Sequence, residues 1–124
     1  MTPGRLETLQ WVGLLAGALV WTAAFLAGIG TTGAGCSVAG TGRGLDGDAW
    51  QIALHATALV LVLGAESAAV LVFARTRSVG KDDAPPEGRV HFFAAAALVA
   101  NTLFLCIIVL SAVGSIAANA CRGA

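Results

Sequence analysis

Residues 90–115 read VHFFAAAALVANTLFLCIIVLSAVGS, a stretch that contains no Asp, Glu, Lys or Arg. A helix of about 20 apolar residues crosses a hydrocarbon core of about 30 Å, so this stretch is long enough to span a membrane. Two further apolar stretches of similar length occupy residues 9–30 and 50–74. The sequence therefore predicts an all-α membrane protein with three transmembrane helices.

The composition agrees with a chain that has lipid as part of its solvent. Hydrophobic residues make up 57% of the 124 residues, charged residues only 11%, and the mean hydropathy is +0.84. A soluble domain of this size carries more charge. We expect a single membrane domain, residues 1–124, embedded in the lipid bilayer. The formal net charge is zero and no basic face follows a phosphate backbone, so nucleic-acid binding is not expected.

The segments between the spans are polar or glycine-rich, and their backbone would be unpaired in lipid. We predict an outer loop over residues 31–49 and a cytoplasmic loop over residues 75–89. Lys and Arg accumulate on the cytoplasmic side of membrane proteins. Five such residues share the side of the N-terminus and two lie on the other side: Arg5, Arg75, Arg77, Lys81 and Arg89 against Arg43 and Arg122. The N-terminus is thus predicted in the cytoplasm and the C-terminus outside.

The first span has a second interpretation, as a cleaved secretory segment. The more specific form of this interpretation is a lipoprotein signal segment, because Cys36 follows small residues. The apolar stretch is longer than the core of such a segment, and Gly33 stands where a larger aliphatic residue is preferred. We therefore favour a retained transmembrane helix.

Glu66 is the acidic residue that lies inside a predicted span. An ionisable group at that depth costs a few kcal/mol, so it should face protein, take up a proton or find a partner. One interpretation is a carboxylate that relays protons or pairs with an ion. The commoner case for a lone carboxylate is a neutral side chain hydrogen-bonded to a neighbouring helix. Asn101 lies at nearly the same depth, and we predict a Glu66–Asn101 contact that fixes the register of the second and third helices.

The two histidines fall at opposite ends of their spans. His55 precedes Glu66 by eleven residues, close to three helical turns, so both project from one polar stripe. It could bind a ligand or a partner there, but it lies about one turn below the outer surface. We favour the interpretation that His55 is simply solvated. His91 begins the third span roughly 25 Å or more away, so one chain cannot clamp a haem with this pair.

No catalytic or metal-binding motif is present in the sequence. The patterns H-E-x-x-H, C-x-x-C, C-x-x-C-H, G-x-S-x-G and the P-loop are all absent. We therefore expect no catalytic residues, no metal site and no bound cofactor, and we expect that the chain is not an enzyme.

The three cysteines differ in their predicted surroundings. Cys36 and Cys121 share the outer, oxidising side, whereas Cys106 falls inside the third span. A Cys36–Cys121 disulfide would tie the outer loop to the C-terminal tail and stabilise it by about 2–4 kcal/mol. Two free thiols are the alternative.

Small residues at four-residue spacing predict close helix packing. They form a GxxxG and a second small pair in the first span and one pair in the second: Gly13, Gly17, Ala24, Gly28, Gly64 and Ala68. Such spacing is frequent by chance in spans rich in Gly and Ala. It indicates close packing and leaves a homo-oligomer open.

The first and third spans carry patterns that resemble a known group. Trp11 to Gly17 followed by Trp21 is similar to a W-x-G-L-x-x-G-x-x-x-W run, and Arg89 to Phe104 is similar to an R-x-x-F-x-A-x-x-A-L-x-x-N/S-x-L-F run. Both runs resemble those of small bacterial membrane proteins that accompany haem–copper cytochrome oxidases and related respiratory complexes. In that group a cysteine follows in the outer loop, a histidine begins the next helix and a cysteine lies in the tail, like Cys36, His55 and Cys121. The resemblance implies a multi-pass protein of the bacterial inner membrane.

The resemblance and the absence of catalytic motifs lead to one main hypothesis for function. We expect a non-catalytic accessory subunit that packs against larger membrane subunits of a respiratory or electron-transfer complex. One alternative is an oligomer that conducts protons or small cations around Glu66. Another is a subunit that contacts a quinone or haem through His55 or His91, together with ligands from a partner.

Overall fold

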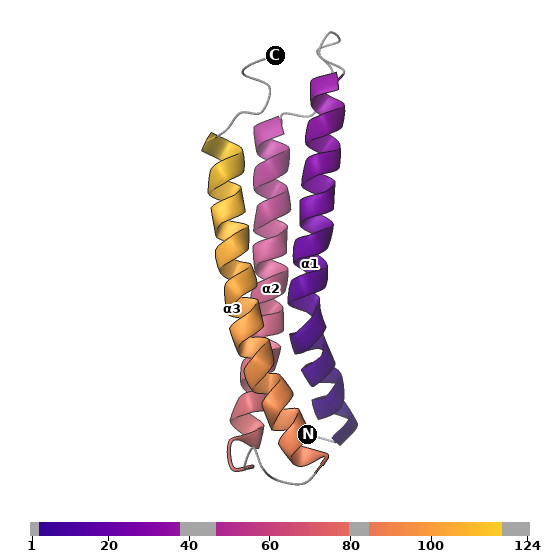
Figure 1. Cartoon of the computed structure of the whole chain (residues 1–124), viewed down its shortest axis with the longest axis vertical. Helices are drawn as coiled ribbons and strands as arrows, with labels where there is room; N and C mark the ends of the chain where they lie inside the picture. The colour runs from indigo at the N-terminus through magenta and orange to yellow at the C-terminus, as the bar shows by residue number, and fades with distance from the viewer. Residues whose placement is uncertain (1–2, 38–46, 80–84, 118–124) are drawn as a thin grey trace.

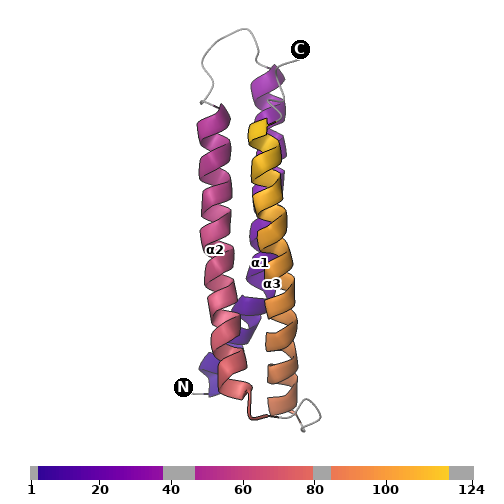
Figure 2. The same cartoon turned by 90° about the vertical axis from the view of Figure 1, so that its left-hand side faces the viewer.

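The chain folds into three long helices that run alongside one another in alternating directions (Figures 1 and 2). The computed structural model describes residues 3–37, 47–79 and 85–117. Helix α1 spans Pro3–Ser37, α2 spans Gly47–Thr76 and α3 spans Glu87–Ala117, and the described residues contain no strand. Each helix packs against the other two. The all-α prediction is confirmed.

Each helix contains a segment that is long and apolar enough to cross a membrane. These segments are Gly4–Thr31, Ala49–Thr76 and Glu87–Ser115, and they enclose the predicted spans 9–30, 50–74 and 90–115. The chain is therefore a three-helix, multi-pass membrane protein. The helices run on into both predicted loops. In the outer loop α1 continues to Ser37 and α2 begins at Gly47, and in the cytoplasmic loop α2 continues to Thr76 and α3 begins at Glu87. A helix that leaves the hydrocarbon keeps its internal hydrogen bonds, so its end need not coincide with the end of the apolar stretch.

One end of the bundle gathers the basic residues that carried the orientation argument. Helix α1 begins, α2 ends and α3 begins at this end, which we call the N-terminal end (Figure 1). Arg75 lies in the last turn of α2 and Glu87 in the first turn of α3, where each charge is favourable to the helix dipole. Arg5 and Arg89 lie near the same end.

Polar side chains along the spans mostly bond to their own helix. The hydroxyls of Thr22, Thr57 and Ser67 donate to the carbonyl four residues earlier, at 2.8 Å in each case. A hydroxyl satisfied in this way does not need water. These residues are therefore compatible with a surface that faces lipid.

The interior of the bundle is built from small side chains, while large ones face outward. The buried apolar residues are alanines with two valines and one isoleucine: Ala58, Val62, Ala65, Ala68, Ala69, Val72, Ala94, Ala97 and Ile108. Leu110 is 70% exposed and Val60 is 67% exposed. Apolar surface of this extent is unusual on a soluble monomer, and lipid is the solvent that suits it.

Candidate functional site

The centre of the bundle holds a buried side chain that joins α3 to α1. Asn101 on α3 is 0% exposed, and its Nδ2 donates a hydrogen bond of 2.8 Å to the carbonyl oxygen of Gly13 on α1. Gly13 has no side chain, and a Cβ built on it would lie 3.3 Å from Ala69 Cβ of α2. Gly13 therefore brings all three helices close together.

Gly17, one turn further along α1, accommodates the other half of the same carboxamide. A Cβ placed on Gly17 would collide with Asn101 Oδ1 and would lie 3.2 Å from Phe104 Cδ2. Asn101 Oδ1 is buried and accepts no conventional hydrogen bond. It occupies the space beside Gly17 that a Cβ would fill. In the structure this GxxxG leaves room for the Asn101 side chain.

Glu66 does not bond to Asn101, and this predicted contact is wrong. Its Oε1 lies 3.5 Å from the hydroxyl of Thr102, which also donates to Leu98 O at 2.8 Å. Its Oε2 is enclosed and has no hydrogen-bond partner. Successive residues of a helix are rotated by about 100°, so Asn101 faces α1 while Thr102 reaches Glu66 on α2. The predicted depth of Asn101 along α3 agrees with the structure, but the direction in which its side chain points around the helix axis does not.

The two histidines lie in opposite halves of the bundle, His55 on α2 and His91 on α3. His55 Nδ1 lies 2.8 Å from Gln51 O of its own helix. His91 Nδ1 lies 2.9 Å from the hydroxyl of Thr76, and its ring stacks on Phe73 with centroids 4.8 Å apart. Because Thr76 is 21 residues after His55, helical rise separates the two sites by roughly 30 Å. This chain does not bring the histidines together.

Aromatic contacts join α1 to α3 at two levels. The rings of Trp11 and Phe93 lie 6.1 Å apart between centroids, and those of Trp21 and Phe104 lie 5.9 Å apart. Trp21 also stacks on Phe25 at 5.5 Å. These tryptophans, part of the sequence pattern noted above, therefore contribute to packing within the chain.

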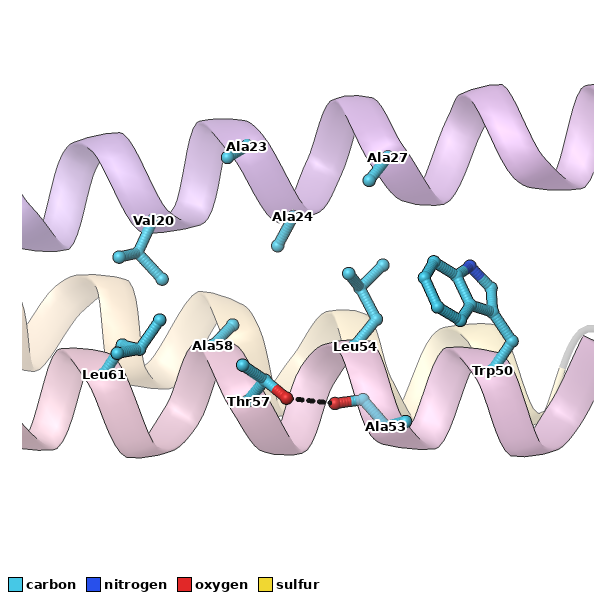
Figure 3. Close-up of a pocket in the computed structure, with 10 residues that line it drawn as sticks. All are labelled: Val20, Ala23, Ala24, Ala27, Trp50, Ala53, Leu54, Thr57, Ala58 and Leu61. Atoms are coloured by element: carbon cyan, nitrogen blue, oxygen red, sulfur yellow. Dashed lines mark hydrogen bonds between the residues drawn. The ribbon is translucent and has the colours of Figure 1, made fainter.

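An apolar groove of about 420 Å³ lies between α1 and α2, in the half of the bundle opposite the N-terminal end (Figure 3). Half of the ten residues that line it are alanines of the two helices: Ala23, Ala24, Ala27, Ala53 and Ala58. Trp50 stands at the end of the groove, and its indole N–H donates to Thr31 Oγ1 at 3.0 Å. This bond joins α2 to α1.

The remaining small residues fall into two classes. Ala24 packs beside the core formed by Ala58, Val62 and Ile108, and a Cβ on Gly28 would make ordinary contacts of 3.7 Å with Gln51 and Leu54. Ala68 is buried, but Gly64 is exposed and a Cβ built on it would meet nothing within 4 Å. Within this chain, Ala68 of this pair is packed and Gly64 is not.

The predicted disulfide lies outside the described part of the molecule. Cys121 and the side chain of Cys36 are not among the described residues, so the bridge stays a prediction. Cys106 is a free, exposed cysteine of α3. Among residues 3–37, 47–79 and 85–117 there is no cluster of three His, Cys, Asp or Glu side chains that could hold a metal.

Sequence reasoning missed the two contacts that hold the centre and the N-terminal end of the bundle. The bond from Asn101 to Gly13 could have been anticipated, because a lone amide in a span tends to face the most closely packed backbone, and GxxxG marks that backbone. The bond between Thr76 and His91 had no such indication. Gln10 is also buried, at 4% exposure, without any pattern that predicts it.

Comparison with protein-family models, curated proteins and solved structures found no match to this chain. The fold and the site define the class of protein. The chain is a three-helix, multi-pass membrane protein with a buried amide at its centre and an apolar groove on one side.

Proposed function

We propose that this chain is a non-catalytic accessory subunit that docks against larger membrane subunits through an unused face of α2. The face consists of exposed residues at alternating spacings of four and three: Val60, Gly64, Ser67, Leu71 and Ala74. We call it the open face of α2. Positions at this spacing lie on one side of a helix, and all five residues here are exposed.

Gly64 is the observation that carries this proposal. A glycine inside a helix costs roughly 1 kcal/mol relative to alanine, so a mid-span glycine is expected to serve some contact. Gly13 and Gly17 serve contacts inside the chain, whereas Gly64 has open space beside it. A second helix that packs on Gly64 would use this space, as small residues do at membrane helix interfaces.

The proposal also includes a place in a respiratory complex and a cytoplasmic N-terminus, and each rests on a separate observation. The resemblance of the runs Trp11 to Trp21 and Arg89 to Phe104 supports a place beside an oxidase or another electron-transfer complex of the bacterial inner membrane. The excess of Lys and Arg at the N-terminal end supports a cytoplasmic N-terminus.

Purification from native membranes in a mild detergent tests the proposal. We expect the tagged chain to co-purify with larger membrane subunits, identified by mass spectrometry. Gly64→Leu should release it from them, because the new side chain fills the space a partner helix would occupy. Gly114→Leu is the matched control, since a Cβ on Gly114 also meets nothing within 4 Å. Recovery of the unmodified chain alone, at monomer or homodimer mass, would count against an accessory role.

Glu66 supports a second candidate function, an oligomer that conducts protons or small cations. Its Oε1 is 3.5 Å from the Thr102 hydroxyl, longer than an ordinary O–H···O hydrogen bond, and its Oε2 has no partner. A carboxyl group left this free at mid-span is typical of ion pathways. Proteoliposomes containing the chain should then show an ion flux that Glu66→Gln abolishes and Thr102→Val leaves in place. Flux that is absent, or equal in all three proteins, would remove this candidate.

A further inference from the structure

Glu66 faces α3 from deep within the candidate span Ala49–Thr76. It lies ten residues before the end of that span, about 15 Å at helical rise, and half of a hydrocarbon core is also about 15 Å. Its Oε2 is enclosed by protein and has no hydrogen-bond partner. Its Oε1 lies 3.5 Å from the hydroxyl of Thr102 on α3. The state of this carboxyl group therefore depends on what Thr102 offers it.

Thr102 presents a lone pair to Glu66 and gives its proton to another atom. A threonine hydroxyl has one proton and two lone pairs. The proton is donated to Leu98 O at 2.8 Å, the length of an ordinary O–H···O hydrogen bond, whereas Glu66 Oε1 at 3.5 Å is beyond that length. Two oxygen lone pairs thus face each other unless the carboxyl group supplies a proton of its own.

Within the described residues, no positive charge lies beside Glu66 to stabilise a carboxylate. On α2, Arg75 is nine residues away and His55 is eleven, about 14 Å and 16 Å at helical rise. On α3, His91 precedes the residue that Glu66 contacts by eleven positions, and on α1 Arg5 lies in the first turn. In apolar surroundings a carboxyl group with neither a donor nor a counter-charge keeps its proton.

A metal cation would find too few ligands at this point. Cations that leave water need a shell of oxygen atoms: Ca²⁺ takes about six to eight, Mg²⁺ takes about six, and K⁺ filters replace the hydration shell with carbonyl oxygens. The contacts of Glu66 bring only its own carboxyl oxygens and the Thr102 hydroxyl together. A proton needs a single lone pair, and the site supplies that.

We propose that Glu66 is a proton-binding site that does not take metal cations. The proton is held on Oε1 and directed at Thr102 Oγ1, which accepts because its own proton is bonded to Leu98 O. As the identity of the conducted ion, this assignment rests on the second candidate function proposed above. As a binding site it belongs to the single chain and needs no oligomer.

A lipid-soluble carbodiimide tests which ion occupies the site. The acid proton passes to one nitrogen of the reagent, a carboxyl oxygen bonds to its central carbon, and the acyl group then migrates to nitrogen, so the whole reagent is added. The full protein in phosphatidylcholine vesicles at neutral pH is treated with dicyclohexylcarbodiimide, digested and mapped by mass spectrometry. We expect an adduct on Glu66 that forms at the same rate, within twofold, when Na⁺ replaces choline as the cation. Protection by Na⁺ of fivefold or more would show a cation site and overturn the proposal.

Other carboxyl groups and two variants serve as controls. Glu7 and Glu87 are exposed at the N-terminal end and should gain at least tenfold less adduct, since carboxylates in water do not react in this way. Glu66→Gln should remove the adduct. Thr102→Val should leave it in place, because Thr102 accepts the proton and does not stabilise a charge. An adduct that forms only in Thr102→Val would show that Thr102 donates to an ionised Glu66, and would overturn the proposal.

Infrared spectroscopy gives a reading that does not depend on access of the reagent. The difference between the unmodified chain and Glu66→Gln should contain the carbonyl band of a carboxylic acid, and carboxylate bands in its place would overturn the proposal. Ion flux is a separate measurement. An acid band with no flux in proteoliposomes would remove the second candidate function and leave the proton site in place.

Discussion

Two glycine regions of this bundle look alike in sequence and differ completely in use. Around Gly13 and Gly17 on α1, a methyl group would meet neighbouring atoms at 3.3 Å or collide with them. Around Gly64 on α2, the same methyl group would meet nothing within 4 Å. The difference teaches that a small residue marks a close contact only after its face is known. In this chain one region closes the bundle, and we propose that the other is reserved for a partner.

Gly17→Ala should have the largest effect on the stability of the isolated chain. The new methyl group collides with Asn101 Oδ1, and Asn101 is 0% exposed, so the carboxamide has no free space into which to move. Overpacking of this kind costs about 1–3 kcal/mol, and loss of the bond to Gly13 adds to it. Reversible unfolding in mixed detergent micelles measures the change. Gly30→Ala, where a Cβ meets nothing within 4 Å, is the control and should lose no stability.

Asn101→Ala should destabilise the chain by a smaller amount, about 1–2 kcal/mol, because it removes one interhelical hydrogen bond and leaves a small cavity. The double variant with Gly17→Ala sharpens the comparison. With the carboxamide gone, the methyl group on Gly17 meets less resistance, so the two losses should not add. Strict additivity of the two free-energy changes in the same unfolding assay would contradict the contact between Gly17 and Asn101.

Gly64→Ala should change stability in the opposite direction. The methyl group enters open space and improves helix propensity, so the isolated chain should gain up to about 1 kcal/mol. Unfolding of the purified chain measures this gain. A clear loss of stability would mean that Gly64 packs within the bundle after all, and the contrast between the two glycine regions would disappear.

Thr102→Ala should have the smallest effect, below about 0.5 kcal/mol. Thr102 is exposed, its hydroxyl bonds to Leu98 O of its own helix, and Glu66 Oε1 is 3.5 Å away. A hydrogen bond at that distance contributes little. A loss of 1 kcal/mol or more in the unfolding assay would show that Thr102 and Glu66 are joined more strongly than their separation indicates.

The sequence predicts the three spans well and the faces of the helices poorly, for one physical reason. Length and hydropathy are properties of a whole segment, so a span such as 90–115 is recognisable from its residues alone. The inward face of a soluble helix is marked by an apolar stripe, but these helices are apolar on every side. GxxxG marks Gly13 as a packing residue, but nothing in the pattern says that Gly64, at a similar spacing from Ala68, turns outward.

Asn101 shows how this limit affects the candidate site. Helical rise fixes the depth of a residue to a few ångströms, so Glu66 and Asn101 were correctly assigned to neighbouring levels. The direction of a side chain around the helix axis is harder to predict, since a shift of one residue turns it by about 100°. Thr102 therefore stands where Asn101 was expected, and Asn101 reaches Gly13 instead.

The bond between Trp50 and Thr31 joins the two ends of successive candidate spans, since Thr31 ends Gly4–Thr31 and Trp50 is the second residue of Ala49–Thr76. It therefore sets the two spans level with each other at this end of the bundle, so that neither helix can slide along the other without breaking the bond.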